Sequence, residues 1–164
     1  TLWDIQEAGQ QLLAEHGYLQ YEVSAYARAG HQAQHNLNYW SFGDFIGIGA
    51  GAHGKLSSPS GQIVRTWKTR LPKDYLDPDK AFLAGERALT SEELPFEFLM
   101  NVLRLNDGCS SALFTQRTGL PLSVLSTARA EAEARGLLLS DPQRLTASRE
   151  GQLFLNDLLQ YFLT

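Results

Sequence analysis

The spacing of apolar residues predicts a first half that mixes one helix with several strands. Apolar positions recur about every 3.6 residues over 2–16, which predicts a helix that ends at Gly17. A polar stretch rich in turn formers, 24–36, is predicted to be a loop. Three other segments show the alternation or the short apolar run of strands: 18–23, 45–50 and 62–69.

Helix-like spacing dominates the second half of the chain. The predicted helices are 72–76, 82–89, a segment that begins near Pro95, 110–118, 122–135 and 148–163. A small hairpin is predicted where residues 137–140 and 143–146 flank Asp141-Pro142. Three helices followed by a hairpin is the order of a winged helix, with the last helix packed behind it. Together the two halves predict an α+β fold.

A change of composition near Leu71 predicts two domains, 1–70 and 71–164. Glycines and histidines gather before this point and helix formers after it. Residues 1–70 carry balanced charge, so the net charge of −4 belongs to the second half. Because Met100 is the only methionine and the sequence opens within a helical pattern, we expect it to be the C-terminal part of a longer protein.

The chain lacks the sequence features of membrane and secreted proteins. It has no apolar run of the roughly 20 residues that span a bilayer, and it opens with no signal-like segment. We therefore expect a cytoplasmic protein without a membrane-spanning segment. The single cysteine, Cys109, cannot form an internal disulfide or hold an iron–sulfur cluster alone, and we interpret it as a partly buried thiol.

Charge argues against a nucleic-acid partner, although the winged-helix order suggests one. The segment in the position of a recognition helix carries Arg129 and Arg135, which Glu131 and Glu133 balance. Affinity for DNA comes mainly from lysine and arginine side chains that neutralise its phosphates. We predict that this half packs against another domain and binds no nucleic acid.

The glycine-rich segment 47–53 lets the backbone approach another group closely. Residues 49–54 match the spacing of a dinucleotide-binding loop, G-x-G-x-x-G, but 55–59 read as strand then turn rather than as the helix that this motif requires. Two interpretations remain: a flat or extended ligand lies against these glycines, or two strands pack closely there.

The sequence His-Asn-x-x-Tyr-Trp at 35–40 is the most distinctive cluster of functional side chains. His31 and His35 stand four residues apart, but no cysteine or carboxylate-rich run accompanies them, which argues against zinc. An imidazole beside two rings could instead supply an axial ligand and stacking surfaces to an iron porphyrin. The alternative is structural: Asn36 bonds the loop backbone while Tyr39 and Trp40 fill a core, and the residues alone favour it.

Three motifs in this order resemble a known family: 21–27 (YEVSAYA), 35–40 (HNLNYW) and 44–53 (DFIGIGAGAH). They are similar to the C-terminal part of radical S-adenosylmethionine (SAM) proteins related to oxygen-independent coproporphyrinogen III oxidase. Within that family the second motif indicates the haem-chaperone branch. Later segments resemble the family's C-terminal domain: 96–105, 118–121 and 154–159.

The resemblance implies an architecture and two binding regions. Residues 1–70 would be the terminal strands and helix of a partial (β/α) barrel, and 71–164 a mostly helical, winged-helix-like domain. The residues implied in haem binding are His35, Asn36, Tyr39 and Trp40, with His35 as the possible iron ligand. Those implied on the SAM side are Gly49, Gly51, Ala52 and His53.

The resemblance also implies a function for the parent protein. The expected parent is a haem chaperone that binds haem and delivers it to acceptor proteins; the alternative is the oxidase, which decarboxylates porphyrinogen propionates oxidatively. Expected cofactors are a [4Fe-4S] cluster, S-adenosylmethionine and haem. The family's CxxxCxxC triad is absent here, so we expect this chain alone to be inactive and to hold no cofactor tightly. Expected partners are the N-terminal barrel part, haem or porphyrin, and haem-acceptor proteins.

Overall fold

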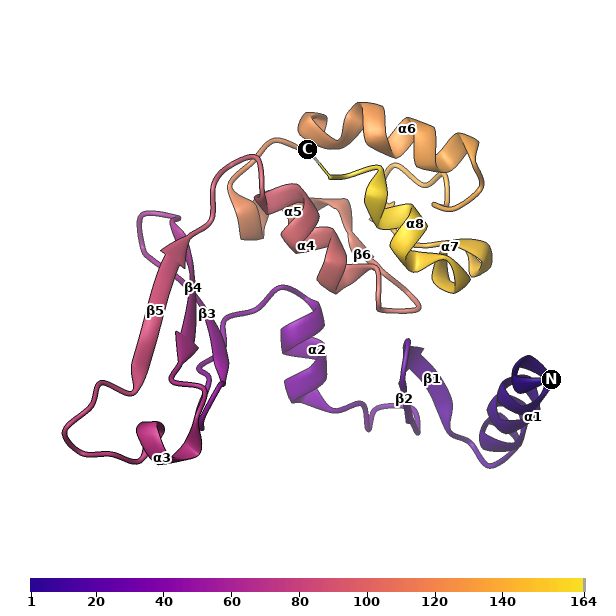
Figure 1. Cartoon of the computed structure of the whole chain (residues 1–164). Coiled ribbons are helices and arrows are strands. Elements are labelled where there is room, and N and C mark those ends of the chain that lie inside the picture. The colour runs from indigo at the N-terminus through magenta and orange to yellow at the C-terminus, as the bar shows by residue number, and fades with distance from the viewer. Residues whose placement is uncertain (164) are drawn as a thin grey trace.

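Most helices of the second half gather around one apolar core, while the first half extends from this body as a hairpin, a short helix and a sheet (Figure 1). The computed structural model describes residues 1–163. Within this range no helix is both long and apolar enough to cross a membrane. The helices are α1 (Leu2–Glu15), α2 (Gln34–Trp40), α3 (Pro72–Tyr75), α4 (Leu94–Val102), α5 (Ser111–Thr118), α6 (Ser126–Ala134), α7 (Arg149–Leu153) and α8 (Leu155–Gln160), with a 3₁₀ turn η1 (Leu122–Leu125).

The strands form small antiparallel sheets that are separate from one another. β1 pairs with β2, β4 lies between β3 and β5, and β6 pairs with β7. Mixed helix and strand content confirms the predicted α+β class. The strands are β1 (Leu19–Glu22), β2 (Ala25–Ala27), β3 (His53–Ser57), β4 (Ile63–Lys68), β5 (Leu83–Ala88), β6 (Cys109–Ser110) and β7 (Arg144–Leu145).

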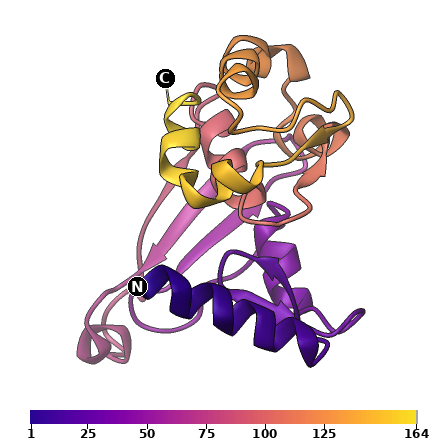
Figure 2. The ribbon, with the colours of Figure 1, turned by 90° about the vertical axis from the view of Figure 1, so that its right-hand side faces the viewer.

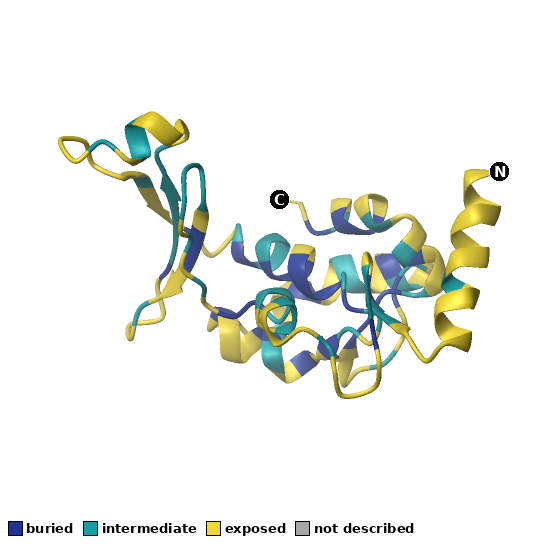
Figure 3. Cartoon of the chain, turned by 90° about the horizontal axis from the view of Figure 1, so that it is seen from below, coloured by how far each residue is buried: buried dark blue, intermediate teal, exposed yellow. Residues whose placement is uncertain are grey.

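Helix α1 confirms the helix predicted over 2–16, and it buries no side chain (Figure 3). Thr1 and Asp4 form a capping box at its start, and Gly17 follows its end with a φ of +81°. Apolar side chains such as Leu2 and Ile5 are exposed. Figure 2 shows the helix lying below the body formed by the C-terminal helices.

Two predictions for the first half are wrong in detail. The stretch 24–36 is not a continuous loop, because it contains β2 and the start of α2. The segment 45–50 is not a strand: only Phe45 pairs, through an isolated bridge to Lys55. The backbone then turns at Gly49 and Gly51, whose φ angles are +109° and +70°, and such angles end a strand. The ladder with β4 therefore begins only at His53.

The helix predicted over 82–89 is also wrong, since Leu83–Ala88 is the edge strand β5. Its residues are good helix formers, but pairing with β4 overrides their propensity. Gly85 lies opposite Trp67, and a Cβ at Gly85 would stand 2.4 Å from the Trp67 ring. The pairing also joins segments on the two sides of residue 70. The division into domains 1–70 and 71–164 stays a prediction.

The C-terminal body has a continuous aromatic and aliphatic core (Figure 3). The Phe98 ring lies between those of Phe42 and Phe114, with centroids 5.5 and 5.3 Å away, so the first half contributes to this core. The helix predicted over 148–163 is broken at Phe154 into α7 and α8. The predicted hairpin is present, with an isolated bridge between Leu138 and Ala147, and β7 also pairs with β6.

Candidate functional site

Helix α2 carries the predicted haem residues on two neighbouring faces. Positions four residues apart lie one above the other on a helix, so His35 shares a face with Tyr39, and Asn36 shares the next face with Trp40. In Figure 1 the helix lies between the β1–β2 hairpin and the sheet β3–β5, below α4. The sequence thus brings all four residues together within two turns.

The face with Asn36 and Trp40 anchors the helix to its neighbours. Asn36 Nδ2 donates a hydrogen bond of 3.1 Å to the Tyr21 hydroxyl on β1. The guanidinium carbon of Arg104 lies 4.4 Å from the Trp40 ring centroid, the geometry of a cation–π contact. These contacts are structural, as the packing interpretation expects, although Asn36 bonds a side chain rather than the loop backbone.

Tyr39 packs within a small aromatic group at the end of α2. Its ring meets the Trp40 ring edge-on with centroids 4.7 Å apart, and it lies 4.6 Å from the Phe45 ring. Both Tyr39 and Trp40 are only half-buried. Their rings therefore support each other and keep part of their surface open to a further flat group.

His35 is the exposed member of the motif. Within residues 1–163 its imidazole makes no hydrogen bond, unlike that of His16, whose Nδ1 lies 2.8 Å from the Leu12 carbonyl oxygen. A free imidazole one turn from the half-buried ring of Tyr39 fits one side of a haem, with a ring nitrogen available to iron. The other histidine considered with it, His31, lies outside α2.

The turn after α2 fixes the end of the helix to β3. Asn38 Nδ2 donates to the Asp44 carbonyl oxygen at 2.9 Å, and a Cβ at Gly43 would stand 2.1 Å from Asn38 Oδ1. Asp44 then pairs with the buried Lys55 of β3 at 2.9 Å. Burial opposes the effect, but hydrogen bonds from Lys55 and Ser57 hold the pKa of the Asp44 carboxyl below its usual value.

The residues predicted on the SAM side are only partly brought together. Gly51 and His53 line a surface cavity of about 490 Å³, whereas Gly49 and Ala52 make backbone hydrogen bonds beside it. The Gly49 amide donates to the Tyr75 hydroxyl at 3.1 Å, and the Ala52 carbonyl accepts from the Lys68 amide at 2.8 Å. Close packing explains Gly47, where a Cβ would stand 2.2 Å from the His53 carbonyl oxygen.

Three further side chains of the same cavity escaped the sequence analysis: Trp67, Lys68 and Arg70. Strand pairing places Trp67 directly opposite His53. The Lys68 ammonium lies 4.5 Å from the Phe82 ring centroid. A cation from Arg70 and a ring from Trp67 suit a ligand that joins a carboxylate to a flat heterocycle, as the methionyl and adenine parts of SAM do. The alternation of 62–69 could have indicated that Trp67 and Arg65 share a face, but not that this face meets His53.

No iron–sulfur site is present among the described residues. None of them form a group of three or more histidine, cysteine, aspartate or glutamate side chains able to hold a metal ion. Cys109 is buried, as predicted, and burial raises the pKa of its thiol to about 12. The residues therefore do not fit a [4Fe-4S] cluster.

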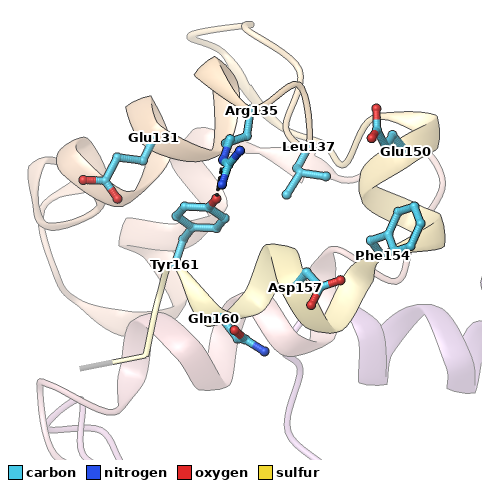
Figure 4. A pocket seen from close by; sticks show the side chains of 8 residues that line it. All are labelled: Glu131, Arg135, Leu137, Glu150, Phe154, Asp157, Gln160 and Tyr161. Carbon is cyan, nitrogen blue, oxygen red and sulfur yellow. Dashed lines mark hydrogen bonds between the residues drawn. The ribbon is translucent and has the colours of Figure 1, made fainter.

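A cavity of about 710 Å³ lies between α6 and the pair α7–α8, and none of the predicted site residues line it (Figure 4). Arg135 Nε donates to the Tyr161 hydroxyl at 3.2 Å across it. Its other charged side chains are acidic: Glu131, Glu150 and Asp157. This lining repels phosphate, in keeping with the expectation of no nucleic-acid partner, which stays a prediction.

Comparison with known proteins identifies relatives along the whole chain. Residues 89–154 match the family described as HemN C-terminal domain. The chain is 48% identical to heme chaperone HemW of Escherichia coli and 45% identical to that of Haemophilus influenzae, over 99% and 100% of its length. It is 33% identical, over 98% of its length, to the mitochondrial radical S-adenosyl methionine domain-containing protein 1 of Bos taurus.

The chain spans less than half the length of these relatives: 43%, 42% and 39%. A solved structure of the Escherichia coli coproporphyrinogen III oxidase HemN, a radical SAM enzyme, has the same fold over 99% of this chain and 41% of its own. The TM-score is 0.67 and the sequence identity 16%. This likeness concerns the fold.

Proposed function

We propose that this chain, which belongs to the HemN-related family that includes heme chaperone HemW, takes part in binding haem and passing it to acceptor proteins. The observation that carries the proposal is the exposed, unpaired imidazole of His35 on helix α2. The neighbouring face of this helix, with Asn36 and Trp40, is anchored to other elements. In this proposal His35 ligates the iron, and the half-buried ring of Tyr39 lies against the porphyrin. Asn36 and Trp40 hold the helix in place.

The comparisons favour a chaperone over the oxidase. The relatives at 48% and 45% identity are named heme chaperone, whereas the oxidase shares the fold at only 16% identity. Oxidative decarboxylation of coproporphyrinogen III by the full natural gene product would instead support the alternative.

We further propose that the cavity lined by Gly51 and His53 faces S-adenosylmethionine. Arg70 would attract the carboxylate of the methionyl group, and Trp67 would stack with the adenine. The [4Fe-4S] cluster of such a protein would supply electrons for reductive cleavage of SAM. Its ligands would come from a partner segment outside this chain, the N-terminal barrel part.

In the proposed role, haem bound at His35 passes to acceptor proteins. We propose that this transfer takes place in the cytoplasm. Because His35 is exposed, an acceptor can approach the iron without unfolding of α2. Release would require a ligand of the acceptor to take the place of the His35 imidazole.

A spectral titration of the full natural gene product with haem tests the proposal. His35→Ala is expected to weaken haem binding more than about tenfold and to move the Soret band, because the iron loses a nitrogen ligand. His16→Ala is the matched control, since His16 is also exposed but belongs to α1. Equal haem affinity and identical spectra for wild type and His35→Ala would contradict the proposal.

A further inference from the structure

Arg104 links the C-terminal body to the helix α2. It lies two residues after α4, within the segment that matches the HemN C-terminal domain. Its guanidinium covers the Trp40 ring, and its Nη2 lies 3.4 Å from Glu22 Oε2 at the end of β1. One side chain thus contacts two elements that precede it by more than sixty residues.

The backbone around Arg104 is held as firmly as its side chain. The Val23 amide donates to the Arg104 carbonyl oxygen at 3.1 Å, and Glu22 forms an isolated bridge with Leu105. Asn106 adds a bond from its Nδ2 to the Gln20 carbonyl oxygen at 2.8 Å. These bonds to β1 and the residue after it fix the backbone at Arg104, and this position allows the side chain to reach Trp40.

Because the Glu22 carboxylate is buried, loss of its contact with Arg104 would be costly to stability. The Glu22 side chain is 3% exposed, and the Ser24 amide and hydroxyl donate to its other oxygen, Oε1, at 3.1 and 3.0 Å. A buried carboxylate needs a nearby cation, and Arg104 provides it. Within residues 1–163 two buried N–H groups at this junction, Trp40 Nε1 and Arg104 Nε, have no hydrogen-bond partner. The cation–π contact of the guanidinium with the indole, rather than hydrogen bonding, thus holds Trp40 at this point.

We propose that Arg104 is a positioning residue for haem binding: by holding Trp40, it fixes the rotation of α2 and so the direction in which His35 meets the iron. The inference rests on the proposed function, because it assumes that His35 ligates haem. A seven-residue helix moves as a unit. Among residues 1–163, its anchoring face makes a hydrogen bond from Asn36 to Tyr21 and a cation–π contact of Trp40 with Arg104. The C-terminal body thereby controls the haem-binding helix.

The test compares variants of the full natural gene product by haem titration and by the indole N–H resonance of Trp40, which Trp40→Phe identifies. The double variant Glu22→Gln/Arg104→Met removes the stacked cation without leaving a buried carboxylate unpaired. It is expected to move the Trp40 resonance, shift the Soret band and weaken haem binding roughly 2- to 30-fold, the range of a lost cation–π contact. Arg104→Lys, which keeps a cation, is expected to recover part of the affinity.

Two controls separate positioning from a general loss of charge or stability. Glu22→Gln alone keeps the guanidinium beside Trp40 and is expected to bind haem more tightly than the double variant. Arg149→Met removes an exposed arginine whose partner is Glu7 of α1, and it is expected to change neither readout. A melting temperature of the double variant close to that of Glu22→Gln establishes that the fold is intact.

The inference is overturned if the double variant binds haem with unchanged affinity and Soret band, or if the Trp40 resonance does not move. It is also overturned if Arg149→Met weakens haem binding equally. Haem binding that depends on His35 but not on Arg104 contradicts only this inference. Binding that depends on Arg104 but not on His35 contradicts the proposed function and leaves the positioning of Trp40 by Arg104 supported.

Discussion

Asp44 and Lys55 show how one ion pair secures the turn that follows the haem-binding helix. The Lys55 side chain is 3% exposed, and its ammonium lies 2.9 Å from Asp44 Oδ1 and 4.2 Å from the Phe42 ring centroid. Asp44→Asn leaves this cation buried without a counter-charge, so we expect the free energy of unfolding to fall by about 1–3 kcal/mol. Urea denaturation of the variant measures the change.

The matched control for this pair removes the buried cation itself. Lys55→Met keeps the length and apolar stem of the side chain, and the double variant with Asp44→Asn is expected to be more stable than Asp44→Asn alone. A double variant as unstable as Asp44→Asn would show that the hydrogen bonds from Ser57 to Asp44, rather than the buried charge, dominate.

The same carboxylate predicts how stability changes in acid. Burial raises the pKa of Asp44, but the Lys55 and Ser57 hydrogen bonds outweigh it and hold the pKa below the usual 3.8. The folded state therefore binds this proton less readily than the unfolded state. Its stabilisation is present above the unfolded pKa and is lost as the pH falls through the lower, folded pKa.

We expect the free energy of unfolding to fall less steeply below about pH 4 in Asp44→Asn than in the wild type. Chemical denaturation at a series of acidic pH values measures the slope. Lys80→Met serves as the control, because the exposed Lys80 pairs with carboxylates of another segment. Parallel slopes for wild type and Asp44→Asn would contradict the prediction.

At the scale of elements, two helical glycines in different surroundings give opposite predictions. In α7 a Cβ at Gly151 would stand 1.9 Å from the Leu137 carbonyl oxygen, which accepts the Ser148 amide bond. In α1 Gly9 has no atom within 4 Å of its Cβ position. Gly151→Ala is therefore expected to lower stability by about 1–3 kcal/mol, and Gly9→Ala to raise it by about 0.5–1 kcal/mol.

Thermal unfolding of the two variants under the same conditions checks both signs. Because alanine has the higher helix propensity at either site, a lower melting temperature of Gly151→Ala isolates the steric effect. Stabilisation by both substitutions would mean that α7 can move away from Leu137.

Local signals predicted the elements that depend on local chemistry. The glycine after α1 marks a helix end as predicted, and Gly119, with a φ of +73°, ends α5 in the same way. The strand β5 was predicted as a helix because its helix propensity is visible in the sequence, whereas its partner β4 lies about twenty residues earlier. Likewise α7 and α8 read as one helix, because nothing in their spacing marks the break at Phe154.

The candidate site follows the same division. The four haem residues fall within positions 35–40, so their proximity was visible from the sequence, whereas the helix α2 that carries them was not predicted. Arg104 and Trp67 were missed because they reach the site through tertiary contacts and strand register. Register depends on turns and on pairing across the sheet, and a one-residue slip would have placed Trp67 on the other face.

At the scale of the whole molecule, the two halves of the chain are held together by several independent contacts. The Phe42 ring lies in the core beside Phe98, and Arg65 of β4 pairs with Glu97 of α4. Pairing of β4 with β5 crosses the predicted boundary near Leu71. A cut in the connection between α3 and β5 therefore breaks none of the contacts that join the halves.

We expect a protease site inserted between Asp79 and Lys80 to be cleaved while the structure persists. Both residues are exposed, and the segment around them lies outside the helices and strands. The fragments are expected to elute together in size-exclusion chromatography and to separate only in denaturant, because the shared core and the β4–β5 ladder remain. Separation under native conditions would instead support two independently folded domains that meet near residue 71. The Lys80 ion pairs with Asp74 and Asp77 lie at the surface, where such pairs contribute little, so their disturbance by the insertion does not affect this outcome.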